Sequence, residues 1–199
     1  PAPVMHEGLD WQWETFEEYI EALEKNNLDI DVCALLPHAA LRVYVMGQRA
    51  INHEVANDAD MLTMRKLAKE AVEAGAFGFS TSRTISHKSL KGEFTPTLRA
   101  HEDELTAIAM GLSDAGAGFM EIVSDWNEPD PETEFEVLKR IIKKSGRLVV
   151  FSCTQRHYSP EVWKDLMSMA RQAHSEWLPI FLFYTSDAAD DLTPLLSFG

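Results

Sequence analysis

The sequence predicts an α/β fold that forms part of a (β/α)8 barrel, with about four strands running parallel to one another. Short apolar runs recur along the chain, and segments with helical periodicity separate them. Each apolar run leads into polar residues, as strands do at the mouth of a barrel, where the loops after the strands carry the chemistry. A complete barrel needs about 250 residues. Because this chain of 199 residues supplies about half of the eight strands, we expect it to form a fragment of a larger barrel.

The first predicted elements are a helix and a strand. Thr15 and Glu18 have the form of a capping box, and apolar residues follow at helical spacing as far as residues 26–27. The apolar run 30–36 then predicts a buried parallel strand, which Pro37 ends because proline cannot donate a hydrogen bond to the ladder. His38 is therefore expected just past the carboxyl end of a strand.

The following segments repeat an order of helix, glycine and strand. Helices are predicted over residues 60–74, 102–115, 131–145 and 160–174, and strands over 77–80, 119–124 and 148–152. The segment from residue 181 onward breaks this order. We expect residues 1–180 to form one partial barrel domain and 181–199 an atypical tail that resembles translated non-coding or adapter sequence. The alternative is a genuine fifth strand over 180–184.

Composition excludes several classes of partner. The chain is 45% hydrophobic and 25% charged, which is typical of a globular domain, and its formal charge of −14 opposes binding to nucleic acid or to anionic membranes. It has neither an apolar run approaching the roughly 18 residues of a membrane span nor a signal peptide pattern at residues 1–8. Cys33 and Cys153 lie in separate apolar runs, so we expect reduced, strand-borne thiols and a cytoplasmic location. The oligomeric state stays open.

Two motifs indicate a family. Residues 37–47 read Pro-His-x-x-Leu-Arg-x-x-Val-Met-Gly, and residues 78–87 read Gly-Phe-Ser-Thr-Ser-Arg-Thr-x-x-His. Together they resemble the amidohydrolase family of D-aminoacylases and N-acyl-D-amino-acid deacylases, over roughly residues 11–180. The resemblance implies hydrolysis of the amide C–N bond of a small N-acyl amino acid by water that a divalent metal, most often zinc, activates.

Neither motif binds a metal, and the resemblance implies that the main ligands lie elsewhere. The family's His-x-His lies upstream of the matched region and its catalytic aspartate on a late strand, so we expect both outside this chain and assign no catalytic residue within it. D-aminoacylases carry a metal-binding histidine at the end of the strand equivalent to 149–155, where this chain has Cys153. Cys153 is the candidate ligand, since thiolates bind zinc, and the alternative is a small buried hydrophobe. The strand 119–125 likewise has Val123 or its neighbours in place of a histidine.

Three residues are candidates for substrate binding. His38 is expected to face the barrel mouth, and the alternative is a structural histidine that bonds a loop carbonyl. Arg83 and His87 extend from the loop after the second strand, where a guanidinium could hold a substrate carboxylate, or both could instead rigidify the loop up to Thr97. We expect Ser80, Thr81 and Ser82 to cap this loop, because no Gly-x-Ser-x-Gly elbow surrounds them and no base is assignable.

The hypothesis from sequence is therefore a fragment of a metal-dependent amidohydrolase, inactive as an isolated segment. Because a fold does not determine a reaction, an alternative remains. That alternative is a non-catalytic α/β module that binds a small acidic ligand through His38, Arg83 and His87.

Overall fold

Five parallel strands form one sheet in the order in which they occur along the chain. The computed structural model describes residues 11–25, 29–124, 126, 131–153 and 159–184. The strands are β1 (Leu36–Pro37), β2 (Gly78–Arg83), β3 (Phe119–Ser124), β4 (Leu148–Cys153) and β5 (Ile180–Tyr184). Helices connect the strands, so the chain forms a partial (β/α)8 barrel, as predicted.

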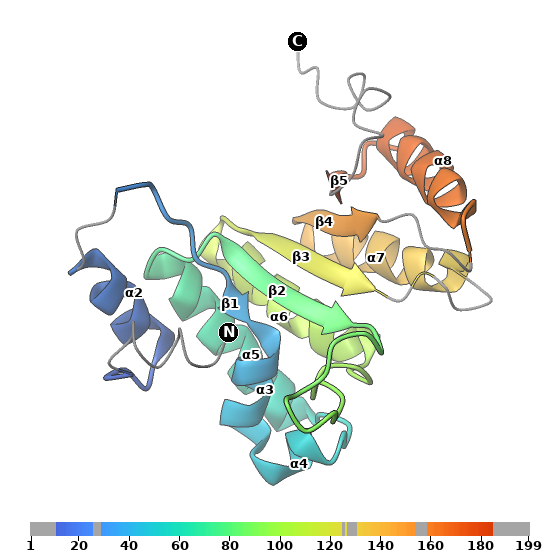
Figure 1. Cartoon of the computed structure of the whole chain (residues 1–199). Helices are drawn as coiled ribbons and strands as arrows, with labels where there is room; N and C mark the ends of the chain where they lie inside the picture. Colours follow the sequence, from blue (N-terminus) through green and yellow to red (C-terminus); the bar gives the residue numbers. More distant parts are fainter. Residues whose placement is uncertain (1–10, 26–28, 125, 127–130, 154–158, 185–199) are drawn as a thin grey trace.

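The helices are α2 (Phe16–Glu24), α3 (His38–Met46), α4 (Gln48–Ile51), α5 (Asp58–Glu73), α6 (Glu102–Ala115), α7 (Pro131–Ser145) and α8 (Val162–Ser175). The predicted capping box of Thr15 and Glu18 is present at the start of α2. Helices α5, α6 and α7 lie on one side of the sheet, and the face turned toward the viewer in Figure 1 carries none of these three. We call that second face the open face.

The core lies between the sheet and this helix layer. Along β3 and β4 every second side chain is buried, which is the period of a strand with one face on a core. Phe151 of β4 meets Phe135 of α7 edge to face, with ring centroids 5.8 Å apart. Phe119, Glu121 and Val123 alternate with the buried residues of β3 and are only partly buried on the open face.

The strand predicted over residues 30–36 is shorter than expected. Only Leu36 and Pro37 pair with β2, opposite Phe79 and Ser80. The segment before them has no partner strand among the described residues, and Cys33 within it is exposed. The expectation of a strand-borne thiol is therefore wrong for Cys33, whereas it is confirmed for Cys153. Pro37 takes part in the ladder because β1 has one neighbour among the described strands and needs no donor on its other side.

The fifth strand, given above as the alternative to an atypical tail, is present. β5 pairs with β4 from Val149 opposite Ile180 to Cys153 opposite Tyr184. The sheet therefore continues past residue 180, and residues 185–199 lie outside the described residues. Within the described part of the chain, no helix has both the length and the apolar character that a bilayer span requires.

Candidate functional site

The candidate site is the edge of the sheet where β2, β3 and β4 end, because parallel strands of a barrel carry their chemistry there. Three groups of polar contacts surround the end of β2. The first centres on His38, the second on Arg83 and the third on Ser82. They differ in how far they are open to solvent.

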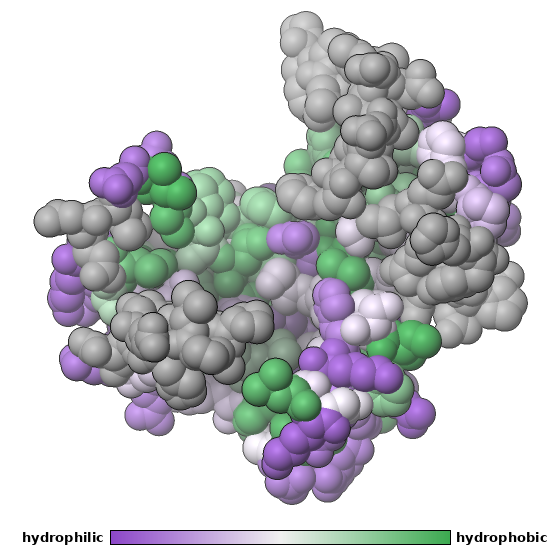
Figure 2. Space-filling view, viewed as in Figure 1, coloured by the Kyte–Doolittle hydropathy of each residue, from purple (hydrophilic) through white to green (hydrophobic). Residues whose placement is uncertain are grey.

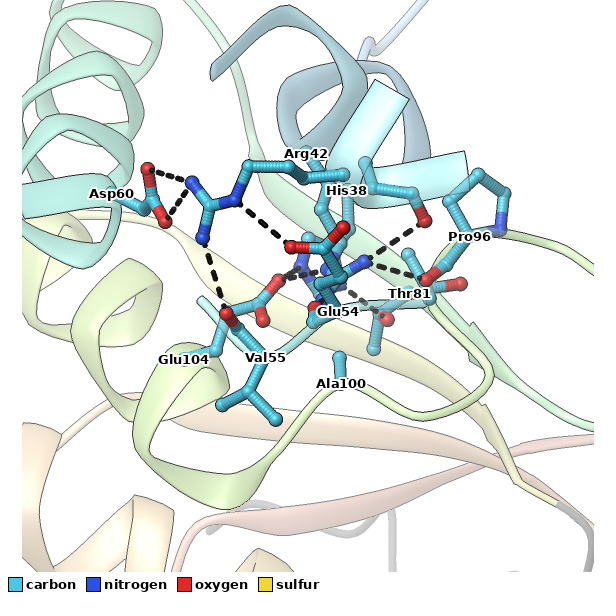
Figure 3. A network of polar contacts seen from close by, with 12 residues as sticks. His38, Arg42, Glu54, Val55, Asp60, Thr81, Pro96, Ala100 and Glu104 are labelled. Atoms are coloured by element: carbon cyan, nitrogen blue, oxygen red, sulfur yellow. Dashed lines mark hydrogen bonds and ion pairs between the residues drawn. The ribbon is translucent and has the colours of Figure 1, made fainter. Parts of the chain in front are cut away.

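His38 is the first residue of α3, directly after β1, and its side chain is fully buried. Its Nδ1 lies 2.8 Å from Oγ1 of Thr81 on β2, and its Nε2 lies 2.9 Å from Oε1 of Glu104 on α6 (Figure 3). An ionised carboxylate only accepts hydrogen bonds, so Nε2 carries the proton and Nδ1 accepts from the Thr81 hydroxyl. Burial lowers the pKa of His38 more than Glu104 raises it, which favours the neutral imidazole.

Arg42, one turn further along α3, holds the surrounding segments together. Its Nε donates to Oε1 of Glu104 at 2.7 Å. Its Nη1 donates to the carbonyls of Pro96 at 3.0 Å and Ala50 at 3.2 Å, and its Nη2 to the carbonyl of Glu54 at 2.5 Å. The Arg42 side chain is 1% exposed, so one buried cation compensates a buried anion, the carbonyl of Ala50 in α4 and two loop carbonyls.

Glu104 is the acceptor that His38 and Arg42 share. Burial acts to raise the pKa of Glu104, but the hydrogen bonds and charges of His38 and Arg42 hold it below its ordinary value. Its second oxygen, Oε2, is buried and has no hydrogen-bond partner among the described residues. All of this network lies on the helix side of the sheet, because Glu104 belongs to α6. The expectation that His38 faces the barrel mouth is therefore corrected, since burial directs its ring toward the helix layer.

Arg83, the last residue of β2, is committed to an ion pair. Its Nε and Nη2 bind the two carboxylate oxygens of Glu134 on α7 at 2.8 and 3.1 Å, and Nη1 donates to the carbonyl of Ala100. Ser124 at the end of β3 donates to the same carboxylate at 2.9 Å. Arg83 thus links β2, α7 and the end of the loop that precedes α6. This geometry agrees with the alternative in which Arg83 rigidifies the loop.

The same loop carries the one exposed candidate. His87 is exposed, and its Nδ1 is hydrogen-bonded to the hydroxyl of Ser82 on β2. Thr97 donates to the carbonyl of Ser82 at 2.6 Å and fastens the far end of the loop to the strand. The sequence offered no base for Ser82, because the four residues between Ser82 and His87 give no periodic signal that brings the two side chains together.

Cys153, the candidate metal ligand, ends β4 and is buried. Burial raises the pKa of its thiol to about 11, so the group is protonated at neutral pH. Within the described residues no three His, Cys, Asp or Glu side chains lie close enough together to hold a metal ion. The described donor set therefore does not fit a metal centre by itself.

The sequence of this chain is similar to those of known enzymes. No family model matches the sequence. D-aminoacylase of Alcaligenes xylosoxydans xylosoxydans is 30% identical over 132 residues, which are 64% of this chain and 24% of that enzyme. N-acyl-D-aspartate deacylase of the same organism is 38% identical over 71 residues, which are 36% of this chain and 14% of that enzyme. The chain thus spans about a quarter or less of these relatives.

Solved structures show the same fold. A crystal structure of D-aminoacylase matches 92% of this chain and 37% of its own length, with a TM-score of 0.71 and 21% identity. N-acyl-D-glutamate deacylase of Bordetella bronchiseptica, solved with zinc and a phosphonate inhibitor, matches 84% of this chain and 33% of its own length, with a TM-score of 0.67 and 20% identity. In sequence this chain is similar to D-aminoacylase and to N-acyl-D-aspartate deacylase, and it shares its fold with D-aminoacylase and N-acyl-D-glutamate deacylase.

Proposed function

We propose that this chain is part of a metal-dependent amidohydrolase that releases an amino acid from a small N-acyl D-amino acid. The observation that carries the proposal is the 30% identity to D-aminoacylase over 132 residues. The second relative, N-acyl-D-aspartate deacylase, belongs to the same substrate class. The partial barrel supports the proposal, because its strands end together at the edge where barrel enzymes bind substrate.

We propose that the complete enzyme uses a divalent cation, and that this cation is zinc. Support comes from a D-aminoacylase described by its binuclear metal centre and from a deacylase solved with zinc. The described residues do not fit such a centre. The proposal therefore assigns the metal ligands and the catalytic aspartate to residues outside the described part, and it derives no catalytic step through the metal here.

We propose that the loop after β2 contacts the substrate. We propose His87 as the contact, because its ring is exposed beside Ser82 at the end of the strand. His38 and Arg83 serve instead to position the strand and its loop, since both are paired with carboxylates. We also propose that the barrel part extends to Tyr184, where β5 ends, and that the protein is cytoplasmic, as its two free thiols suggest.

The alternative function, a non-catalytic module for small acidic ligands, is less well supported. It needs a free cation to bind the ligand, and Arg83 already holds both oxygens of Glu134. The relatives whose activities are named are hydrolases of N-acyl D-amino acids. We therefore keep the hydrolase as the proposal.

The test is an assay of the protein encoded by the complete reading frame. We expect it to release amino acid from N-acetyl-D-aspartate, N-acetyl-D-glutamate or N-acetyl-D-methionine, and to leave the matched L-isomers intact. Chelation should abolish this release, and added zinc should restore it. The 199-residue chain alone is expected to be inactive. The proposal fails if the complete protein hydrolyses none of these amides with zinc present.

A further inference from the structure

The end of β4 directs its cysteine away from the open face. Val149 and Phe151 are fully buried, and Phe151 packs on Phe135 of α7, so these two side chains face the helix layer. Successive side chains of a strand point to opposite faces. Cys153 follows Phe151 by two residues and therefore faces the helices as well, in agreement with its 5% exposure.

The positions that face the open side near the strand ends carry no ligand that zinc ordinarily takes. Ser82 of β2 and Val123 of β3 are register partners, and both are partly buried on the open face. On β4 the corresponding open-face position is Ser152, next to Cys153. Zinc sites in proteins use histidine, cysteine, aspartate or glutamate. These three positions have two hydroxyl groups and an aliphatic side chain instead.

Glu121 is the remaining donor on these strands. Across β2, β3 and β4, Glu121 and Cys153 are the only residues of the four ligand types. Glu121 faces the open side between Ser80 of β2 and Val150 of β4. It stands three residues before the end of β3, which is about 10 Å at a rise of about 3.3 Å per residue. Its Cα therefore lies in the middle of the barrel wall, below the mouth.

We infer that β2, β3 and β4 supply no ligand to the metal centre and form a metal-free wall of the barrel, with Ser82 and Ser152 turned toward its interior. This inference rests on the proposed function, since it concerns where the metal of that enzyme is held. It departs from the expectation that Cys153 replaces a histidine ligand. The protonated state of the buried thiol agrees with it, because the thiolate is the form that binds metals.

The experiment counts zinc per polypeptide by mass spectrometry in the complete protein and in two variants, Cys153→Ala and Glu121→Gln. Circular dichroism checks that each variant is folded. We expect both variants to keep the zinc content of the unmodified protein. Loss of one zinc ion from either folded variant would overturn the inference and leave the proposed function standing.

If the unmodified protein holds no zinc, that result contradicts only the proposed function. A third variant then keeps the inference testable. Ser82→His together with Val123→His places two imidazoles on register partners of the open face. We expect this variant to bind Co²⁺ at least tenfold more tightly than the unmodified protein, as followed by visible absorption. Equal binding would overturn the assignment of these positions to the barrel interior, and the inference with it.

Discussion

His38 and Glu104 are 66 residues apart in the sequence, and their Nε2 and Oε1 atoms lie 2.9 Å apart in the buried layer between sheet and helices. Arg42 donates to the same oxygen from its Nε at 2.7 Å. Helices α3 and α6 therefore meet at one carboxylate, and β2 joins them through the contact of Thr81 with the His38 ring. Because the network lies behind the sheet, it positions the end of β2 and does not itself reach the mouth.

Replacing Arg42 should destabilise the protein strongly. Arg42→Met leaves the buried carboxylate of Glu104 without its cation, and breaking a buried ion pair in this way costs about 3–5 kcal/mol. The matched control is Arg65→Met, which breaks a half-exposed pair with Asp114 and should cost less than about 1 kcal/mol. Urea unfolding followed by tryptophan fluorescence measures both. Equal losses in the two variants would contradict a special role for the buried pair.

The stability of the protein should fall on mild acidification. Burial lowers the pKa of His38 below its ordinary 6.5, so between these two values the unfolded chain binds a proton that the folded chain does not. Stability is then lost as pH falls below about 6.5, by up to about 1.4 kcal/mol per pH unit. The pKa of Glu104 is also lowered, and its contribution is lost below about 4.5, its ordinary value.

The variant His38→Gln separates the first of these two losses from other titrations. Glutamine can still donate to Glu104 but does not bind a proton near neutrality. We expect its free energy of unfolding to change less than that of the unmodified protein between pH 7 and pH 5.5. Parallel pH profiles for the two proteins would show that His38 is not the responsible group.

The start of β2 requires glycine. Gly78 has φ +143°, and a Cβ built on it would lie 1.8 Å from the carbonyl oxygen of Phe119 on β3. Gly78→Ala should therefore separate the two strands and prevent accumulation of folded protein. Gly146→Ala is the control, since that glycine also has a positive φ, +65°, but nothing lies within 4 Å of the added carbon. It should cost about 1–2 kcal/mol of unfolding free energy. Similar yields of soluble protein from both variants would contradict this account.

Much of the fold was predictable from sequence because its signals are local. The helices from α5 to α8 and the strands β2, β3 and β4 follow from periodicity, with glycine after three of those helices. The strand predicted over residues 30–36 was too long, although its apolar residues satisfy a strand pattern. Among the described residues only its end has a partner strand, and the sequence does not reveal this. Helix α3 was not predicted, because Pro37 was interpreted only as the end of a strand.

The candidate site was less predictable because its contacts are not local. His38 and Arg42 belong to a recognised motif, but Glu104 carries only the signal of an acidic residue in the first turn of a helix. Nothing in the sequence states that this carboxylate and Thr81 meet at the same imidazole. The pairing of Arg83 with Glu134, 51 residues away, is hidden in the same way. Such contacts follow from the order of strands in the sheet.

Arg83 should control the mobility of the loop after β2. Arg83→Lys keeps the charge but loses the two parallel hydrogen bonds to Glu134, because an ammonium cannot reproduce the fork of a guanidinium. We expect trypsin to cut after the exposed Lys88 and Lys91 several-fold faster, as read by mass spectrometry. Arg140→Lys, which weakens an ion pair with Glu102 outside this loop, should leave the rate unchanged. Equal acceleration in both variants would mean that the effect is global.

The two cysteines should differ sharply in reactivity, and this difference checks the fold before β1 and at the end of β4. Cys33 is exposed before β1, whereas Cys153 is buried in β4 with a thiol pKa of about 11. Because the thiolate is the reactive form, we expect one thiol per chain to react rapidly with Ellman's reagent at pH 8 and the other only on unfolding. Cys33→Ser should remove the rapid phase, and Cys153→Ala should leave it intact. Two rapid thiols in the native protein would place the end of β4 in solvent and contradict its packing against the helix layer.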